Sequence, residues 1–284
     1  DIFCAGHALL SDGRLLVSGG HVADDVGEDQ ASIYNPFNDS WQRLPAMNAG
    51  RWYPSNLTLP NGDMLVMAGT VAPKKVNALP QRWQITTQSW RTLSGGRQLE
   101  FPSYADYYPF LHVAPNGAVF NSGPQQIARY FDPSETGDWS DVAMNEEYYR
   151  EYGSAVLYEE GKVLMIGGSL RGGAPTASAQ VIDLNSVQPT WRSVDDLHFA
   201  RRHLNATLLA DGKVLVTGGT SKALDDYTGG VYQAELWDPV SEKWTVLAAG
   251  SRYRGYHSTA LLLPDGRVWI GGGGHPDPIN GEQA

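Results

Sequence analysis

The sequence predicts an all-β protein, a propeller built from repeats of one four-stranded unit. Three observations carry this prediction. A motif of two short apolar runs joined by a glycine-containing turn occurs six times along the 284 residues. A tryptophan follows each of the first five copies at a similar interval. Glycine, tryptophan and tyrosine are abundant while charged residues make up only 18%, a composition typical of many short strands joined by tight turns.

Each copy of the motif predicts a β-hairpin. In residues 11–20, SDGRLLVSGG, and in residues 264–273, PDGRVWIGGG, an Asp-Gly turn leads into an apolar run that ends in glycines. Asp-Gly and Asn-Gly are strong hairpin signals because such turns require a positive φ. The six turn glycines are Gly13, Gly62, Gly117, Gly161, Gly212 and Gly266. Their spacings of 49, 55, 44, 51 and 54 residues are close to the period of about 50 residues that kelch-type propeller blades have.

The recurring tryptophans complete each unit, because a tryptophan is expected near the last of four strands. These tryptophans are Trp41, Trp90, Trp139, Trp191 and Trp244. Five units are complete and a sixth ends after its second strand, so the chain holds about five and a half blades of a single kelch-type β-propeller domain. An open array of blades leaves an apolar face uncovered at each end. We therefore expect more polypeptide at one or both ends of residues 1–284.

Bulk properties argue against several classes of protein. The formal net charge is −10, whereas a nucleic-acid-binding protein is expected to carry a basic patch. No apolar run approaches the roughly 20 residues that a membrane-spanning helix needs. Cys4 is the only cysteine, so the chain has neither an internal disulfide nor a cysteine-based zinc framework. We expect no nucleic-acid partner and no membrane span.

Counting back from the turn glycines reveals a second regularity. The residue nine places before each turn glycine is a cysteine, tyrosine or histidine in all six units: Cys4, Tyr53, Tyr108, Tyr152, His203 and His257. Equivalent positions in radial repeats lie at one level around the axis, so these side chains are expected to line a funnel there. Phenolate and imidazole together suit Cu(II) or Fe(III), and tetragonal N,O coordination points to copper. The alternative is that aromatic residues simply fill the channel.

Three arginines form a further regular set. Arg51, Arg150 and Arg201 each lie eleven residues before a turn glycine. In an acidic protein they could form a locally positive rim that attracts polar or anionic substrates. The alternative interpretation is that they close hydrogen bonds between blades.

These motifs together resemble a known family. The segments DIFCAGHALLSDGRLLVSGG (1–20), GRWYPS (50–55) and RGYHSTALLLPDGRVWIGGGG (254–274) resemble the copper radical oxidases, which include galactose oxidase and glyoxal oxidase. The RWYP sequence is closer to the glyoxal-oxidase-like branch. The resemblance spans nearly the whole chain through its order of blades.

The resemblance implies a larger architecture and one metal. The family has a seven-bladed propeller with a single mononuclear copper, followed by a C-terminal β-sandwich domain. On this basis residues 1–284 lack an N-terminal blade, the end of the propeller and the C-terminal domain.

The resemblance also assigns roles to four residues. Cys4 and Tyr53 would be joined by a thioether, a cofactor derived from the protein itself. Tyr53 would be a copper ligand and carry the tyrosyl radical. Tyr256 would be the axial tyrosine ligand and the base that takes the substrate hydroxyl proton, and His257 would be an imidazole ligand.

The implied activity is a two-electron oxidation. A primary alcohol or aldehyde, including a carbohydrate, would be oxidised with O2 to give H2O2, by a monomeric extracellular enzyme. The alternative function is a non-catalytic kelch propeller that binds a protein or glycan partner. It is also open whether the fragment itself is active.

Three departures from the family pattern stand out. The family's second histidine ligand comes from the C-terminal domain, and His7, His21, His112, His198, His203 and His275 do not match its motif. The place of the tryptophan that stacks on the thioether in galactose oxidase reads Gly69-Thr70-Val71. The sugar-binding arginine falls near Tyr104, so galactose is not the expected substrate. The candidate residues of the substrate pocket are Trp52, Tyr104, Tyr108, Tyr152, His203 and Arg201.

Overall fold

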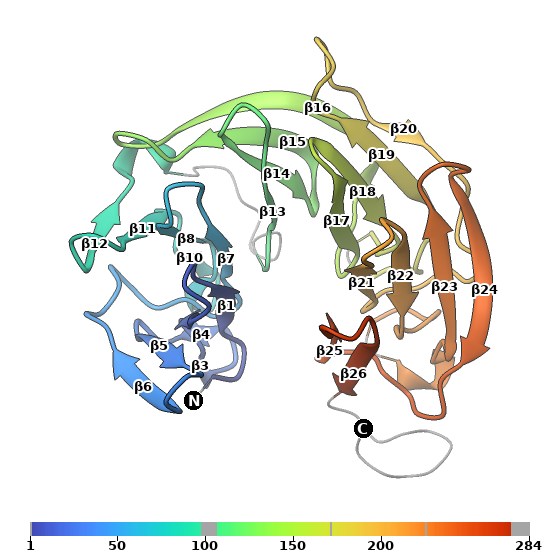
Figure 1. The fold of residues 1–284 in the computed structure, drawn as a ribbon, viewed down its shortest axis with the longest axis horizontal. Coiled ribbons are helices and arrows are strands. Elements are labelled where there is room, and N and C mark those ends of the chain that lie inside the picture. Colours follow the sequence, from blue (N-terminus) through green and yellow to red (C-terminus); the bar gives the residue numbers. More distant parts are fainter. Residues whose placement is uncertain (1, 98–106, 171, 225, 274–284) are drawn as a thin grey trace. The chain divides into compact units, whose positions relative to one another are not determined.

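The structure is a computed structural model that describes residues 2–97, 107–170, 172–224 and 226–273. Within these ranges the regular structure is β-sheet, apart from two short 3₁₀ helices, η1 (Ser94–Gly96) and η2 (Tyr227–Gly229) (Figure 1). The predicted all-β class is confirmed. No helix in the described ranges is long and apolar enough to cross a membrane.

Five antiparallel sheets of four strands, each formed by strands that are consecutive or nearly so, succeed one another along the described chain, and a two-stranded sheet follows. The strands are, sheet by sheet, β1 (Gly6–Leu9), β2 (Leu15–Ser18), β5 (Ala31–Asn35) and β6 (Ser40–Arg43); β7 (Ser55–Thr58), β8 (Met64–Met67), β11 (Gln81–Gln84) and β12 (Ser89–Thr92); β13 (Phe110–Val113), β14 (Val119–Gly123), β15 (Gln125–Asp132) and β16 (Asp138–Tyr149); β17 (Ser154–Glu159), β18 (Lys162–Ile166), β19 (Ala179–Asp183) and β20 (Arg192–Ser193); β21 (Asn205–Leu208), β22 (Val214–Thr217), β23 (Gln233–Asp238) and β24 (Lys243–Ala249); and finally β25 (Ser258–Leu262) with β26 (Val268–Gly272). This is the predicted order of five complete units and a partial sixth.

Two small hairpins extend the first two four-stranded sheets. The strands β3 (His21–Ala23) and β4 (Val26–Gly27) pair with each other after β2, and β9 (Thr70–Ala72) and β10 (Lys75–Val76) do the same after β8. The sequence analysis did not predict them, because strands of two or three residues carry too short a pattern.

The turn glycines adopt the conformation that the sequence pattern predicts. All six have φ between +74° and +85°. In the first hairpin the Gly13 N–H donates to the Leu10 carbonyl over 3.0 Å, and Gly266 repeats this bond to Leu263 over 2.9 Å. A residue with a Cβ is strained at this φ, so the glycine fixes the register in which the first and second strands of each unit pair.

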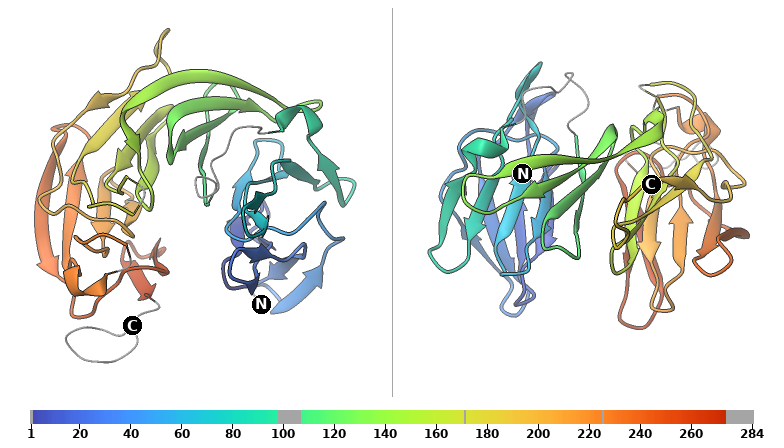
Figure 2. Two further views of the ribbon diagram at one scale, coloured as in Figure 1. Left: turned by 180° about the vertical axis from the view of Figure 1, so that it is seen from behind. Right: turned by 90° about the horizontal axis from the view of Figure 1, so that it is seen from above.

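The apolar cores lie between neighbouring sheets. One core joins Leu16 and Ile33 of the first sheet to Val66 and Trp83 of the second, and a corresponding core joins the fourth sheet to the fifth. Figure 2 shows the twisted sheets from two further sides. Because both faces of a blade are apolar, each sheet needs a neighbour to remove that surface from water.

The recurring tryptophans reinforce this packing. Trp90 in β12 donates its indole N–H to the Pro45 carbonyl over 2.8 Å, and Trp244 in β24 donates to Asp195 over the same distance. In both cases the acceptor lies just after the fourth strand of the preceding sheet. Trp41, Trp90, Trp139 and Trp244 lie in fourth strands as predicted, and Trp191 immediately precedes β20.

The contacts within the chain divide it into two units. Unit 1 comprises Asp1–Asn121 and Arg129–Asp141, and unit 2 comprises Ser122–Ala128 and Val142–Ala284. The first and second sheets belong to unit 1, and the fourth, fifth and sixth sheets belong to unit 2. The strands of the third sheet contribute to both units. The candidate site residues of each unit are therefore described separately.

Candidate functional site

The six residues nine places before the turn glycines share an unusual backbone conformation. Their φ angles lie between +48° and +65° although none is a glycine. A bulky side chain in the left-handed region costs about 1–3 kcal/mol, so six such residues at one register call for a local cause. The six residues are Cys4, Tyr53, Tyr108, Tyr152, His203 and His257.

Backbone hydrogen bonds connect successive members of this set. In unit 1 the Tyr53 N–H donates to the Cys4 carbonyl over 3.0 Å, and the Tyr108 N–H donates to the Tyr53 carbonyl over 2.9 Å. In unit 2 the His203 N–H donates to the Tyr152 carbonyl over 2.8 Å. Within each unit the positions that the sequence aligned are thus directly joined through the main chain.

In unit 1 an aromatic cluster surrounds Tyr53. The indole of Trp52 stacks on the Tyr53 ring, with ring centroids 3.8 Å apart and planes inclined by 17°. Tyr108 stacks less closely at 4.8 Å, and Tyr107 meets Tyr53 edge-on at 5.2 Å and 85°. Stacked and edge-to-face pairs each add about 0.5–1.5 kcal/mol beyond burial. The Tyr53 ring is therefore held by three aromatic neighbours, and its residue is only 2% exposed.

The only thiol of the chain lies in the same cluster. Cys4 is 5% exposed. Its pKa is raised, chiefly because burial disfavours the thiolate, while hydrogen bonds from the side chains of Tyr53 and Trp52 act in the opposite direction. The structure thus brings Cys4 and Tyr53 into side-chain contact, as the sequence predicted for these neighbouring units.

Tyr108 also lines a small cavity in unit 1. Its hydroxyl donates to the Ala5 carbonyl over 3.3 Å, and with His7 and Asn56 it borders a hollow of about 200 Å³. Tyr108 thus lies beside Tyr53, and its role in a substrate pocket stays a prediction. Tyr104, predicted for the same pocket, lies outside the described residues.

In unit 2 a second cluster gathers around Tyr256. The Tyr256 and His257 rings are 3.9 Å apart between centroids, and His203 meets Tyr256 at 5.0 Å. Tyr152 lies 4.3 Å from His203 and 5.8 Å from Tyr256. Two phenols and two imidazoles therefore come together from three successive sheets of unit 2.

A partly buried ion pair borders this second cluster. The Arg202 guanidinium lies over the Tyr152 ring at 4.8 Å and binds the Glu151 carboxylate at 3.1 Å. The side chain of Arg202 is 2% exposed. A cation over a phenol face is stabilised by the ring quadrupole, so Arg202 fixes Tyr152 and places positive charge beside the cluster.

A further set of functional candidates, which the sequence analysis did not identify as a set, lies one register place earlier. The residues ten places before the turn glycines are Phe3, Trp52, Tyr107, Glu151, Arg202 and Tyr256, and several of them contact the rings of the two clusters. Three of them are fixed by paired backbone bonds to the residue eight places after their turn glycine, as in Trp52 with Thr70 and Arg202 with Thr220. Counting ten residues back from each turn glycine, in place of nine, identifies this set in the sequence.

The expectation of a positively charged rim is corrected. Arg51, Arg150 and Arg201 are all 0% exposed. Each donates from Nη1 to the carbonyl six places after its turn glycine, which is Ala68, Gly167 and Gly218 respectively, over 2.8–3.0 Å. Each of these carbonyls belongs to the repeat unit that the arginine itself opens, so the bonds lie within one unit and are not the bonds between blades that the alternative expected.

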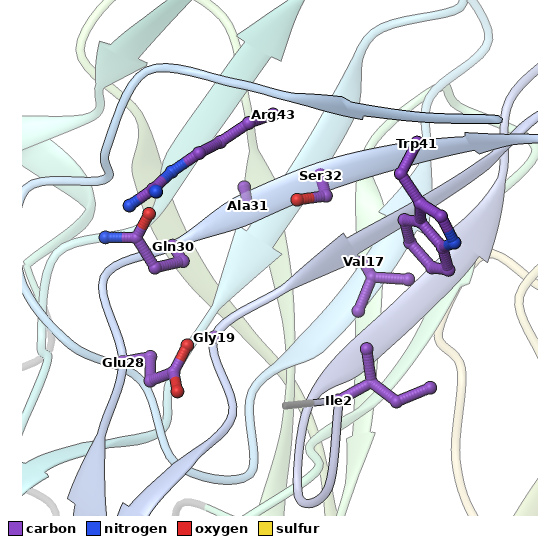
Figure 3. A pocket seen from close by; sticks show the side chains of 9 residues that line it. All are labelled: Ile2, Val17, Gly19, Glu28, Gln30, Ala31, Ser32, Trp41 and Arg43. Atoms are coloured by element: carbon purple, nitrogen blue, oxygen red, sulfur yellow. The ribbon is translucent and has the colours of Figure 1, made fainter.

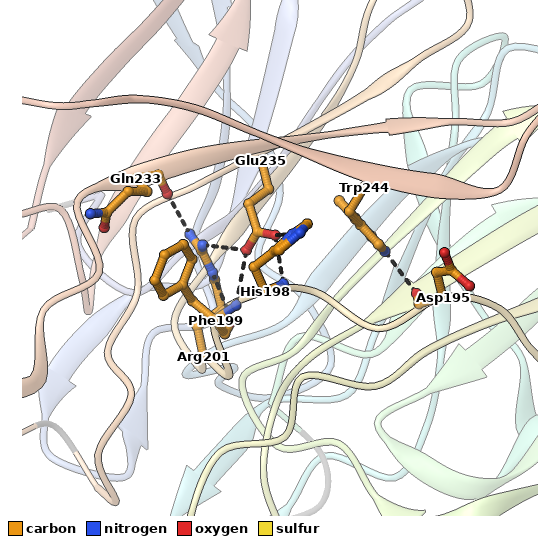
Figure 4. Close-up of polar contacts among 7 residues, drawn as sticks. All are labelled: Asp195, His198, Phe199, Arg201, Gln233, Glu235 and Trp244. Carbon is orange, nitrogen blue, oxygen red and sulfur yellow. Dashed lines mark hydrogen bonds and ion pairs between the residues drawn. The ribbon is translucent and has the colours of Figure 1, made fainter.

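Arg201 was predicted from the sequence to line a substrate pocket, but it lies in the interior of the fold. Its Nη2 donates to the buried carboxylate of Glu235 over 2.7 Å, and the His198 N–H donates to the other oxygen of that carboxylate over 2.7 Å (Figure 4). A guanidinium removed from water needs such a partner, so Arg201 belongs to the interior of the fifth sheet.

The donor types present fit copper. Buried Tyr53 in unit 1, and Tyr256 with adjacent His257 in unit 2, are oxygen and nitrogen donors of the kind that Cu(II) accepts. In the described part of the chain no group of three or more His, Cys, Asp or Glu side chains could hold a metal by itself. A site that uses these donors depends on tyrosines from both units, and their joint role stays a prediction. His275 lies outside the described residues.

A hollow of about 330 Å³ on the first sheet does not include these residues (Figure 3). Ile2, Val17 and Trp41 form its apolar part, and Glu28 and Arg43 its polar part. Trp41 is 53% exposed, whereas the equivalent Trp244 is buried against the preceding sheet. The hollow thus lies on a face that packs against another sheet in the later units.

Comparison with known proteins confirms the fold and the resemblance. Residues 1–123 match the family described as Glyoxal oxidase N-terminus. A galactose oxidase of Gibberella zeae is 28% identical over 96% of this chain and 42% of its own length. The aldehyde oxidase GLOX of Vitis pseudoreticulata is 27% identical over 96% of this chain and 56% of its own length.

Solved structures agree with these matches. A fungal alcohol oxidase of the AA5 family, in complex with copper, superimposes with a TM-score of 0.85 at 27% identity over 96% of this chain and 59% of that one. The structure of YjhT matches 99% of this chain with a TM-score of 0.71 at 15% identity, which supports the fold alone. The chain is thus similar to galactose oxidase, aldehyde oxidase GLOX and a copper-containing alcohol oxidase, as the sequence motifs indicated, and it spans about half the length of the curated relatives it matches.

Proposed function

We propose that the chain forms the propeller part of a copper radical oxidase. The enzyme would oxidise a primary alcohol or aldehyde with O2 and release H2O2. The observation that supports this best is the contact between the single buried thiol of Cys4 and the buried Tyr53 phenol. A propeller that only binds a partner has no need of this pair.

The residues of the chain would act as follows. Cys4 Sγ would form a bond to a carbon of the Tyr53 ring, and the two hydrogens lost would pass to O2. The modified Tyr53 would carry the radical and take a hydrogen atom from the substrate carbon, while the Tyr256 phenolate would take the hydroxyl proton. Copper, when bound by Tyr53, Tyr256 and His257, would supply the second one-electron centre. The net reaction is RCH2OH + O2 → RCHO + H2O2, in which the alcohol loses two electrons and two protons and O2 takes them up.

Trp52 would take the place of the stacking tryptophan that the sequence lacks after Gly69. It precedes Tyr53 directly and stacks on its ring at 3.8 Å. We propose that this indole covers the radical-bearing ring, and that Tyr108, Tyr152 and His203 border the substrate pocket. The substrate is expected to be a small alcohol, aldehyde or carbohydrate, and the protein to be monomeric and extracellular, as the related oxidases led us to expect.

We also propose that the remainder of the propeller, with the second histidine ligand, lies outside residues 1–284. The face of the first sheet that carries Trp41 supports this. In three later units the equivalent indole donates to a carbonyl of the preceding sheet, as Trp90, Trp139 and Trp244 do. A further four-stranded blade of the same protein would offer that carbonyl to Trp41.

The thioether provides the test. The intact protein, loaded with copper in air, should be lighter by two hydrogens, and peptide mapping should join Cys4 to Tyr53. Cys4→Gly suits the positive φ of this position and should abolish the mass change while the near-ultraviolet spectrum keeps its folded form. A copper-loaded protein that retains a free Cys4 thiol would overturn the proposal in favour of a binding propeller.

A further inference from the structure

The hairpin formed by β3 and β4 reaches the aromatic cluster of unit 1 through two side chains. His21 begins β3, and Asp25 lies in the turn between the strands with φ of +61°. Neither residue belongs to the motifs that led to the proposed site. Both nevertheless contact aromatic residues that touch Tyr53.

The first contact fixes the indole of Trp52. Its Nε1–H donates to Nδ1 of His21 over 3.1 Å. The same indole stacks on Tyr53, and its single N–H is shared with the thiol of Cys4. Phe3 also packs edge-to-face with the His21 ring, with ring centroids 5.5 Å apart. His21 thus accepts the hydrogen bond that fixes the rotation of the indole ring in its own plane while the ring stacks on Tyr53.

The second contact fixes the ring of Tyr107. Its hydroxyl donates to Oδ1 of Asp25 over 2.5 Å. The Tyr107 ring stands nearly perpendicular to both Trp52 and Tyr53, at 89° and 85° with centroids 5.2 Å away in each case. A hydrogen bond to a carboxylate is among the stronger ones in proteins, so Asp25 anchors the edge-on wall of the cluster.

The base of the hairpin is rigidly joined to the chain that carries Trp52. The Gly20 N–H donates to the Arg51 carbonyl over 2.9 Å, and the Arg51 N–H donates to Glu28 over 2.9 Å. A Cβ on Gly27 would lie 2.2 Å from the backbone nitrogen of Trp52. Because no side chain fits there, the backbone of the hairpin packs directly against that of Trp52, and the two side-chain contacts start from this close backbone packing.

We infer that His21 and Asp25 are positioning residues for Tyr53. They hold Trp52 and Tyr107 against two sides of the Tyr53 ring and so keep the Cys4 thiol and the phenol in one orientation. The inference rests on the proposed function for its chemical consequence, since a cross-link between Cys4 and Tyr53 forms only where sulfur and ring are held together. The two contacts themselves do not depend on any metal.

Matched variants separate the hydrogen bond from the shape of each side chain. His21→Asn keeps an acceptor at the place of Nδ1, while His21→Leu has a similar shape without one. Asp25→Asn keeps the oxygen acceptor, while Asp25→Gly removes it, and both residues tolerate a positive φ. Tyr107→Phe removes the donor from the other side.

The first measurement uses the copper-free protein. Cys4 is the only cysteine, so its rate of alkylation by iodoacetamide reports on this cluster alone. We expect His21→Leu and Asp25→Gly to raise the rate by about tenfold, which corresponds to the loss of one hydrogen bond of about 1.4 kcal/mol. His21→Asn and Asp25→Asn should stay within about twofold of the unchanged protein. The near-ultraviolet circular dichroism of His21→Leu should move toward that of Trp52→Phe.

The second measurement follows the loss of two hydrogens after copper is added in air. The acceptor-free variants should cross-link more slowly, and the acceptor-retaining variants should recover the rate. Equal alkylation rates within each pair would overturn the positioning role. If instead the copper-free rates separate as expected and no protein ever cross-links, the proposed function fails while the positioning role stands. If His21→Leu unfolds, Tyr107→Phe and the Asp25 pair give the same decision.

Discussion

At the scale of single residues, Cys4, Tyr53 and their four equivalents all have a positive φ angle. The same position of the repeat therefore combines an unusual backbone conformation with a chemically reactive side chain. Glycine or asparagine would occupy such positions with less strain. The chain instead places thiol, phenol and imidazole groups there, and the bonds between successive main chains hold them at one register within each unit. Backbone strain that persists at reactive side chains is typical of functional sites.

Residues in the interior allow a sharp test of the corrected arginine role. The Glu235 carboxylate is 0% exposed and accepts from Arg201 Nη2 and from the His198 main chain. Glu235→Gln should reduce the free energy of unfolding by about 3 kcal/mol, because the Arg201 charge stays buried without its counter-ion. Urea denaturation followed by tryptophan fluorescence measures this difference.

The control for this prediction is Glu242→Gln. Glu242 pairs with Arg192 at the surface, and an exposed pair contributes about 0–1 kcal/mol. Similar losses for both variants would contradict the greater weight expected of the buried Arg201–Glu235 pair.

At the scale of the elements, the sequence predicted the strands well where a turn determined them locally. The glycine turns such as Gly13 and Gly266 fixed the first two strands of every unit, and the tryptophans marked the fourth. The hairpin of β3 and β4 was missed because its strands are short and its role comes from contacts to Trp52 and Tyr107, which are distant in sequence. No local pattern reports such contacts.

The fourth-strand tryptophans give a prediction at this scale. Trp244 joins the fifth sheet to the carbonyl of Asp195 in the fourth over 2.8 Å. Trp244→Phe should lower the free energy of unfolding by about 0.5–1.5 kcal/mol, because it removes the one hydrogen bond that this indole makes to the preceding sheet. Trp41→Phe is the matched control in residues 1–284, since Trp41 is half exposed and should change stability by less than about 0.5 kcal/mol. Equal effects would contradict the role of these indoles in joining sheets.

At the scale of the whole molecule, the order of the sheets followed from the sequence, but the joint site did not. Counting from the turn glycines correctly placed Cys4 beside Tyr53, and placed His257 at a position equivalent to His203. Which side chain covers Tyr53 depended on rotamers, and the sequence did not single out Trp52 for that place. That Tyr256 and Tyr53 bind one metal rests on the family resemblance, because no local motif joins residues about 200 positions apart in the sequence.

Acid stability offers a last prediction for the folded molecule. Burial lowers the pKa of His112 in β13 from 6.5 to about 4, and the residue is 9% exposed. Between these values the unfolded chain binds a proton that the folded protein does not. The free energy of unfolding should therefore fall as the pH drops from 6.5 towards 4, by up to about 1.4 kcal/mol per pH unit. His112→Gln removes this group and should flatten the slope between pH 6.5 and 4.5, as measured by urea denaturation at a series of pH values. Parallel slopes for both proteins in that window would show that the imidazole is protonated in the fold as readily as in the unfolded chain, and that other groups govern acid unfolding.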